Sequence, residues 1–215
     1  MHFNSVLDKE RLSILPKLKK IPSSFYLSGG TALALQLNHR ISIDFDFFSP
    51  DAFDTQELIE KLSFDVFEGD SFKIVQEAEN SLDIVTEKAV KISFFRYRYL
   101  PLFPLIQTPY FKVADKLDIG ASKLIAIAQR SSQKDFFDLY YLLQHFSLEK
   151  IFDVAALKYP SFNPVLYLKA LTYFDDCDST PPVLISDCIS FSEVKTILTE
   201  KSLFLFENLN KLKPI

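Results

Sequence analysis

Two aspartates, Asp44 and Asp46, have a type and a spacing that could do chemistry. They lie in the run IDFDFF, where apolar and polar side chains alternate as in a β-strand, so both carboxylates are expected on one face of it. Two carboxylates this close repel each other unless a cation lies between them, and Mg²⁺ binds one or two carboxylates together with phosphate oxygens. The pair therefore predicts a Mg²⁺ site for phosphate chemistry; a strand edge kept soluble by its charge is the alternative.

The chain contains four glycines, and two of them, Gly29 and Gly30, stand side by side ahead of the aspartates. They follow the apolar run FYLS and precede the helical run TALALQLN, so they mark a strand-to-helix turn. Glycine permits positive φ, and the backbone amides that open a helix bind phosphate; a turn can also use glycine for its geometry alone. With the aspartates, the turn would place phosphate-binding amides beside metal-binding carboxylates, as a nucleotidyltransferase requires.

The elements that must position these residues form a mixed α/β half followed by a helical half. Helices are predicted over 6–20, 31–38 and 54–62, and strands over 25–28, 43–48, 72–78, 82–87 and 90–99. Residues 100–109 contain three prolines and are predicted to be a connector. Beyond it, apolar spacing and capping residues predict helices over 115–130 and 134–146, and others starting at Ser147, Asn163 and Ser190.

This pattern predicts an α+β fold, with a mixed β-sheet nucleotidyltransferase core and flanking helices, followed by a C-terminal helical bundle. The predicted core domain covers residues 1–109. The predicted helical domain covers residues 110–215 and is expected to complete the active-site cleft.

The composition is that of a folded protein, with 215 residues, 48% of them hydrophobic and 24% charged. Two cysteines, Cys177 and Cys188, are too few for a disulfide framework and predict free thiols. We find no signal peptide and no apolar run of membrane-spanning length, so we expect a cytoplasmic protein without a membrane segment.

Charge is distributed unevenly along the chain. Residues 51–87 contain eleven acidic side chains and two lysines, whereas residues 88–134 contain nine basic and two acidic side chains. The basic segment could face a polyanion such as RNA, or it could simply form solvated faces. Within it, FFRYRY alternates arginine with tyrosine and could stack a base and hold RNA, unless it is an edge strand protected by arginine.

The chain resembles the AbiEii/AbiGii-type nucleotidyltransferase toxins, whose core has the DNA polymerase β-like minimal nucleotidyltransferase fold. The resemblance covers most of the chain and rests on four runs: GGTALAL (29–35), HRISIDFDFF (39–48), DIGASKLIAIAQRSSQKDFFDLYYLL (118–143) and ALTYFDD (170–176).

The resemblance implies roles for individual residues. Asp44 and Asp46 match the family's metal-binding catalytic pair, and Lys123 and Asp138 match further catalytic positions. The nucleotide-binding positions implied are Ser28, Gly29, Gly30, Thr31, Arg40 and Ser42. Asp135 matches another acidic position of the same motif.

The spacing of the basic residues supports a role for Lys123 in part. Lys116, Lys123 and Arg130 are seven residues apart, so they predict one polar stripe on a helix, which could stabilise a phosphate or could be a solvated face. For Asp138, pairing with Lys134 on the same helix is a sufficient structural explanation.

Together these observations predict an Mg²⁺-dependent nucleotidyltransferase that uses an NTP and acts on RNA, with the tRNA 3′ end as the acceptor implied by the resemblance and an antitoxin as partner. One alternative is a catalytically silent nucleotide- or protein-binding module, because Ser93 stands where a third carboxylate is expected; Asp83 is another candidate for that carboxylate. A second alternative is transfer to a protein hydroxyl.

Overall fold

The computed structural model describes residues 1–178, 180–185 and 189–209. The chain divides into two compact units, the first spanning Met1–Asp115 and the second beginning at Lys116. This division lies a few residues after the predicted boundary at 109. Cys177 is a free thiol, as predicted, and Cys188 lies outside the described residues.

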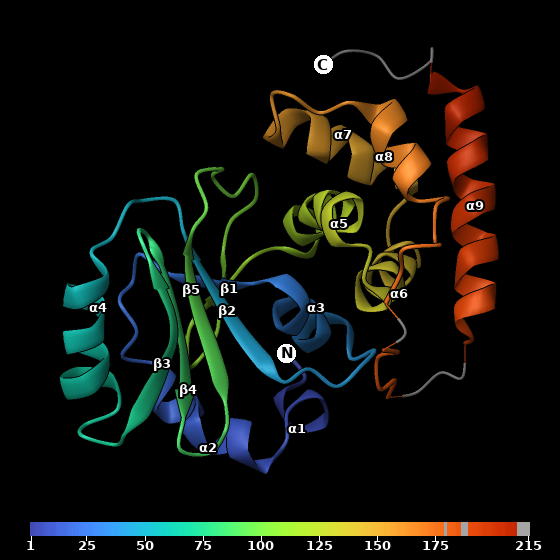
Figure 1. Ribbon diagram of the computed structural model, residues 1–215. Helices are drawn as coiled ribbons and strands as arrows, with labels where there is room; N and C mark the ends of the chain where they lie inside the picture. The colour runs from blue at the N-terminus through green and yellow to red at the C-terminus, as the bar shows by residue number, and fades with distance from the viewer. Residues whose placement is uncertain (179, 186–188, 210–215) are drawn as a thin grey trace. The chain divides into compact units, whose positions relative to one another are not determined.

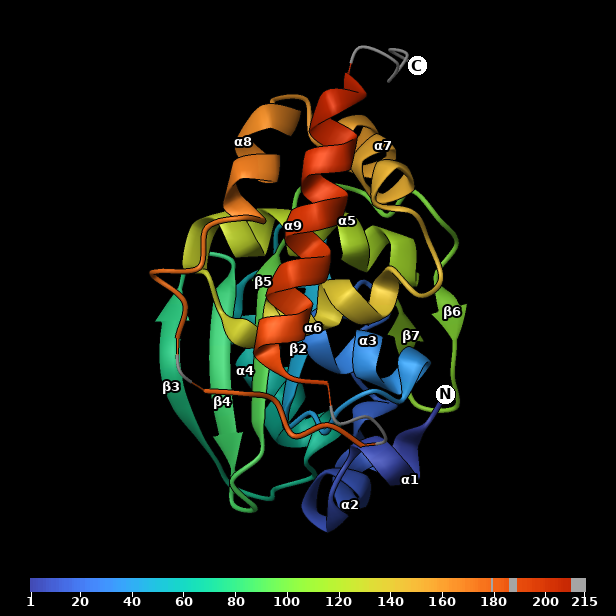
Figure 2. The same cartoon turned by 90° about the vertical axis from the view of Figure 1, so that its right-hand side faces the viewer.

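A mixed sheet forms the centre of the first unit. Its seven strands in the described residues follow the order β3-β4-β5-β2-β1-β7-β6 (Figure 2). β2 is parallel to β5 and β1 is parallel to β7, while the other neighbours are antiparallel. The strands are β1 (Tyr26–Ser28), β2 (Asp44–Ser49), β3 (Phe72–Ala78), β4 (Ser81–Thr86), β5 (Lys91–Arg96), β6 (Ile106–Gln107) and β7 (Lys112–Val113).

The predicted strands β1 to β5 are confirmed, but the prediction of a plain connector over 100–109 is wrong. β6 begins in that segment, and β7, which follows it, pairs with β1 through Leu27 and Val113. Because each of these strands has two residues, neither produces a detectable alternation of apolar and polar side chains.

Short helices flank the sheet in the first unit (Figure 1). They are α1 (Phe3–Val6), α2 (Lys9–Leu18), α3 (Gly29–Leu37) and α4 (Thr55–Lys61), which continues into a π-helical turn, η1 (Leu62–Val66). α4 confirms the helix predicted over 54–62, and Asp54 caps it, because its carboxylate accepts hydrogen bonds from the backbone amides of Gln56 and Glu57.

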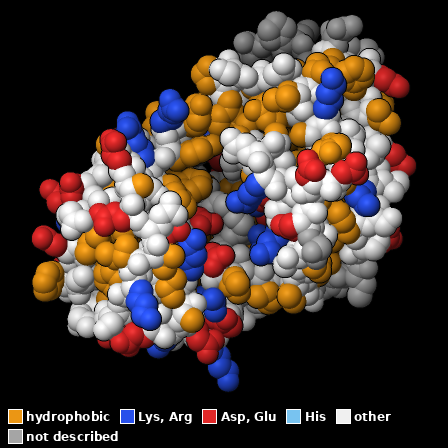
Figure 3. Space-filling model, viewed as in Figure 1, with side chains coloured by type: hydrophobic (Ala, Val, Ile, Leu, Met, Phe, Trp, Pro, Cys, Tyr) orange, Lys and Arg blue, Asp and Glu red, His pale blue; other side chains and the backbone are white. Residues whose placement is uncertain are grey.

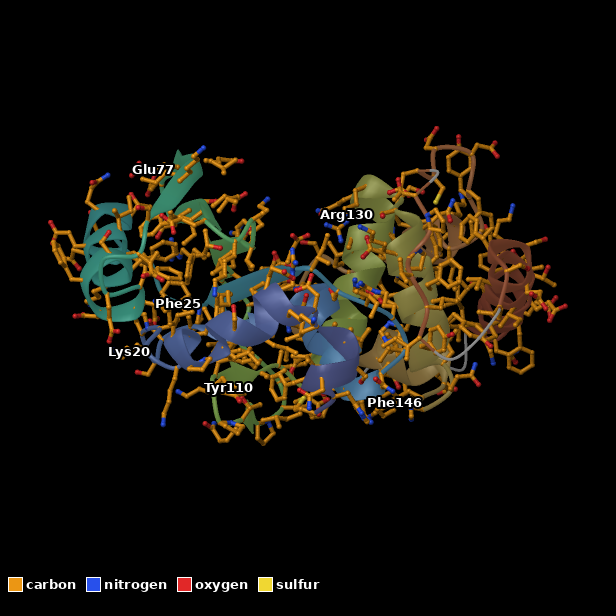
Figure 4. The ribbon with its side chains drawn as sticks, turned by 90° about the horizontal axis from the view of Figure 1, so that it is seen from below. Lys20, Phe25, Glu77, Tyr110, Arg130 and Phe146 are labelled. Atoms are coloured by element: carbon orange, nitrogen blue, oxygen red, sulfur yellow. The ribbon has the colours of Figure 1, made fainter. Side chains whose placement is uncertain are left out.

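Phenylalanine builds the core beneath the sheet. Phe45 and Phe47 of β2 are fully buried, and the Phe47 ring stacks on Phe94 of β5 with a centroid distance of 5.5 Å. Phe25, which lies just before β1 and is labelled in Figure 4, packs its ring edge-on against the ring of Phe94. These rings hold one face of β2 inside the unit, so the other face is left for polar side chains.

The outer edge strand, β3, is exposed along most of its length. Its exposed residues include the hydrophobic Ile74 and Val75. Charged side chains are interspersed with hydrophobic ones on the face of the molecule that Figure 3 shows. The register of β3 against β4 shifts between Ile74 and Gln76. Bulges and charged side chains are features that keep an exposed strand edge from pairing with another chain.

The second unit is helical in the described residues. Its helices are α5 (Lys116–Arg130), α6 (Gln133–Leu142), α7 (Leu148–Lys158), α8 (Pro164–Ala170) and α9 (Phe191–Glu207). The predicted caps at Ser147, Asn163 and Ser190 are confirmed, and Ser190 forms a capping box with Glu193. The described elements therefore match the predicted mixed sheet with flanking helices, followed by helices alone. None of the described helices combines the length and the apolar character needed to cross a membrane.

Candidate active site

Asp44 and Asp46 lie on the polar face of β2. They are half-buried, whereas Phe45 and Phe47, which alternate with them, are fully buried. The prediction that both carboxylates share one face is therefore confirmed.

The glycine turn lies directly against this pair. α3 begins at Gly29, whose φ of +68° is unfavourable for any residue with a side chain. An ideal Cβ at Gly29 would lie 3.1 Å from Asp46 Oδ2, and Ser28 is the direct partner of Asp46 across β1 and β2. α3 therefore begins beside a carboxylate. The positive φ and the lack of space for a Cβ explain why glycine occupies position 29.

Thr31, Arg40 and Ser42 form a chain of hydrogen bonds ahead of β2. The hydroxyl groups of Thr31 and Ser42 lie 2.7 Å apart, and Thr31 Oγ1 donates to the backbone carbonyl of Asp44. Arg40 donates to Ser42 Oγ over 3.2 Å, and all three side chains are buried. These contacts position the start of β2, so they act on Asp44 through its backbone.

The strand register places Ser93 and Asp83 in the same row as Asp46. Asp46 is opposite Ser93 on β5, and Ser93 is opposite Asp83 on β4. Side chains opposite each other on neighbouring strands share a face. Asp83 is therefore a carboxylate of this face, one strand beyond Ser93.

Lys91 is the basic residue of this face that stands directly opposite Asp44; Lys73 lies on the same face, two strands further out on β3. The Nζ of Lys91 is 2.8 Å from Asp83 Oδ2. The hydrogen bond to Asp83 raises the pKa of Lys91 against the opposing effect of burial, and the charges of Asp83, Asp44 and Asp46 add to the rise. Asp83 Oδ1 is buried with no hydrogen-bond partner. The Lys91 ammonium group thus lies among the carboxylates of Asp44, Asp46 and Asp83 on this face.

The donor set suits a cation that also binds phosphate. Among the described residues there is no group of three or more His, Cys, Asp or Glu side chains that could enclose a metal ion. Mg²⁺ needs one or two carboxylates and takes its remaining ligands from water and substrate phosphate. Asp44 and Asp46 beside the Gly29 backbone fit that requirement.

Lys123, Asp135 and Asp138 belong to the second unit and lie together in its interior. Lys123 Nζ is 2.7 Å from Asp135 Oδ1 and also pairs with Asp138. The two carboxylates are fully buried, and the Lys123 side chain is 5% exposed. The prediction of a polar stripe through Lys123 is therefore wrong. The predicted pairing of Asp138 with Lys134 is also replaced, because Asp138 forms its ion pair with Lys123.

Arg130, whose own side chain is 64% exposed, reaches the buried Asp135 from the last turn of α5 (Figure 4). Its guanidinium donates to both oxygens of Asp135, over 2.7 and 2.9 Å. Burial acts to raise the pKa of Asp135, but the charges and hydrogen bonds of Lys123 and Arg130 outweigh it, so the pKa is lowered. The cluster joins α5 to α6 through charged groups.

A comparison with protein families identifies the chain. Residues 18–180 match the family model described as "Nucleotidyl transferase AbiEii toxin, Type IV TA system". The chain belongs to the AbiEii nucleotidyltransferase toxin family. An uncharacterized protein of Aquifex aeolicus (strain VF5) is 36% identical to it over 79% of this chain and 84% of that protein.

Solved structures support the fold assignment of this AbiEii protein. The nucleotidyltransferase toxin MenT4 of Mycobacterium tuberculosis H37Rv is similar to it with a TM-score of 0.63 and 18% identity, over 92% of this chain and 82% of that chain. JHP933 of Helicobacter pylori is similar with a TM-score of 0.52 and 18% identity, over 94% and 91% of the two chains. The predicted nucleotidyltransferase fold is therefore confirmed.

Lys91 is a residue of this AbiEii site that local sequence patterns do not indicate. Its proximity to Asp44 and Asp83 depends on the pairing of three strands, which no local pattern reveals. The signal that could have indicated it is a lone lysine preceding the otherwise uncharged run ISFF.

Proposed function

We propose that this AbiEii protein is a divalent-cation-dependent nucleotidyltransferase that passes a nucleotidyl group from an NTP to a hydroxyl group of an RNA acceptor. The acceptor oxygen bonds to the α-phosphorus, the bond between the α- and β-phosphates breaks, and pyrophosphate leaves. The observation that carries the proposal is the position of Asp46: its carboxylate lies against the Gly29 backbone and shares a face with Asp44. Two carboxylates beside the opening of a nine-residue helix are the parts needed to bind a metal-bound triphosphate.

In the proposed reaction, this chain binds and orients the triphosphate. The amides that open α3 at Gly29 and Gly30 face the phosphates, helped by the positive end of the helix dipole. Asp44 and Asp46 would hold Mg²⁺, which supplies charge neutralisation for the oxygens at the reacting phosphorus. The buried Thr31, Ser42 and Arg40 keep β2, and with it Asp44, in register with α3.

Membership of the AbiEii family supports our proposals for the acceptor and the partners. For this chain we propose the tRNA 3′ end as the acceptor, a cognate antitoxin as the protein partner and the cytoplasm, where NTP and tRNA are available, as the site of the reaction. We keep Lys123 and Asp138 as candidate catalytic residues of the helical unit, although their contacts with each other explain their presence structurally.

A labelling experiment tests this function. The purified protein is incubated with each α-labelled NTP, Mg²⁺ and total tRNA, and the label on RNA is measured. Asp44→Asn and Asp46→Asn are expected to abolish transfer without lowering the melting temperature. Asp51→Asn, which changes an exposed carboxylate just beyond β2, is the matched control and should transfer as wild type does.

Two results would contradict the proposal. Equal transfer by Asp44→Asn and wild type would mean that the pair does not hold the catalytic cation. Label that appears on a co-expressed protein and never on RNA would move the acceptor to a protein hydroxyl.

Ser93 favours a second candidate function, a catalytically silent nucleotide-binding module. It is the direct neighbour of Asp46 on β5 and supplies a hydroxyl in place of a carboxylate, and the next carboxylate, Asp83, already pairs with Lys91. This candidate predicts NTP binding that requires a divalent cation, with no covalent product from any RNA or protein pool.

A further inference from the structure

Aromatic rings continue the polar face of the sheet beyond the carboxylates. Phe48 follows Asp46 by two residues on β2, so its side chain leaves the same face about 7 Å further along the strand. Phe48 is opposite Phe95 on β5. Past the end of that strand, Tyr97 and Tyr99 continue the alternation of half-buried with exposed residues. We call Phe48, Phe95, Tyr97 and Tyr99 the ring row.

The four rings of the ring row form a continuous chain of contacts. The Phe48 ring lies 5.8 Å from the Phe95 ring and stacks on the Tyr97 ring at 5.1 Å, with 30° between the planes. The rings of Tyr97 and Tyr99 meet edge-on at 5.5 Å. These contacts fix the orientation of each ring before any ligand binds.

The ring row differs from the aromatic core on the other face of β2. Phe45 and Phe47 are fully buried, whereas all four rings of the row are half-buried and keep part of their surface accessible. Backbone pairing holds the row in place, because the amide of Tyr97 donates to the carbonyl of Ser49 over 2.7 Å. The guanidinium of Arg98 lies 5.9 Å from the centre of the Tyr99 ring and adds a positive charge at this end.

We propose that the ring row binds the base of the nucleotide whose triphosphate is held at Asp44 and Asp46. A nucleotide carries a flat aromatic base one ribose away from its phosphates, and the chain presents fixed rings one step along the same face from its carboxylates. Stacking on tyrosine and phenylalanine accepts any base, because every base has a π-face. The inference rests on the proposed function and names the base subsite of the same site.

The binding experiment separates the base from the phosphates. Calorimetry measures the affinity of the full chain for each of the four common NTPs and for inorganic tripolyphosphate, all with Mg²⁺. Tyr97→Leu should weaken NTP binding about tenfold, since a stacked base loses its aromatic partner, and should leave tripolyphosphate binding unchanged. Tyr97→Phe keeps the ring and should bind NTP within about twofold of wild type.

A fluorescence readout reports the contact directly. The chain contains no tryptophan, so Tyr99→Trp introduces a single one beside Tyr97. We expect NTP to quench this tryptophan and tripolyphosphate to leave it unchanged at concentrations where calorimetry shows both bound. The melting temperature of each variant confirms that it is folded.

The possible failures are distinguishable. If folded Tyr97→Leu binds every NTP as tightly as wild type, the proposed base subsite is wrong. The same holds if this variant loses affinity for tripolyphosphate as well as for NTP. If Tyr97→Leu loses affinity for a single-stranded oligonucleotide but not for NTP, the rings serve an acceptor, which also overturns the proposal. If tripolyphosphate binding does not depend on Asp44 and Asp46, the proposed function itself fails.

Discussion

Lys91 Nζ lies 2.8 Å from Asp83 Oδ2, on the face of the sheet where Lys91 is also the direct partner of Asp44. This lysine therefore brings a positive charge to the carboxylates that are candidates for binding a divalent cation. A resident positive charge opposes the entry of a second one.

Removing the charge of Lys91 should strengthen cation binding. We expect Lys91→Met to bind Mn²⁺ about threefold more tightly than wild type in the absence of nucleotide, since a neighbouring positive charge is lost. Calorimetry with Mn²⁺ measures this. Lys73→Met, which changes an exposed lysine on β3, is the control. Unchanged or weaker Mn²⁺ binding by Lys91→Met would contradict the expectation.

Gly29→Ala should damage the site in a way that Gly69→Ala does not. Both glycines have positive φ, +68° and +90°, so alanine at either costs about 1–2 kcal/mol of unfolding free energy. At Gly29 the new Cβ also meets Asp46 Oδ2, whereas at Gly69 it meets nothing within 4 Å. Denaturant unfolding should show similar losses of unfolding free energy for the two variants. Calorimetry should show that only Gly29→Ala binds Mn²⁺ more weakly than wild type. Equal Mn²⁺ affinities would remove Gly29 from the site.

Lys123→Met should destabilise the helical unit strongly. The substitution removes an ammonium group from two fully buried carboxylates, Asp135 and Asp138, and breaking a buried ion pair costs about 3–5 kcal/mol. Chemical denaturation measures the loss, and Lys150→Met, an exposed lysine on α7, should be nearly neutral. A Lys123→Met protein that is as stable as wild type but inactive would instead assign Lys123 to the reaction.

The acid stability of the protein should depend on Asp135. Its pKa in the folded protein is lowered from 3.8, so its contribution to stability is complete above pH 3.8 and is lost as the pH falls below that value through the folded-state pKa. Below pH 3.8, the unfolding free energy of Asp135→Asn should therefore fall less steeply with acid than that of wild type. Circular dichroism of denaturant unfolding at several pH values gives both slopes, with the exposed Asp175→Asn as control. Parallel slopes for wild type and Asp135→Asn would disprove this.

Local patterns were sufficient for much of the fold. The alternation in IDFDFF predicts β2 and the common face of its aspartates, and the capping residues Asp54, Ser147 and Ser190 predict helix starts. Each of these features depends on interactions within a few residues, which is why sequence alone reveals them.

Features that depend on distant pairing could not be predicted. The row of Asp46, Ser93 and Asp83 requires the registers of three strands, and none of them follows from composition. The burial of Lys123 could not be predicted from helical periodicity, which assigns charged residues to the solvent-exposed face. A lysine paired with two aspartates can instead occupy an interior position.

The parallel pairing of β1 with β7 has a consequence during synthesis. Leu27 pairs with Val113, and the Ala114 amide donates to the Leu27 carbonyl over 2.9 Å. β2 and its carboxylates leave the ribosome long before β7 does, so a nascent chain holds β1 with one backbone edge open until residues 112–114 emerge. The acidic strand β2 is thus made long before β7, and β7, which covers the open edge of β1, is the last strand of the first unit to emerge.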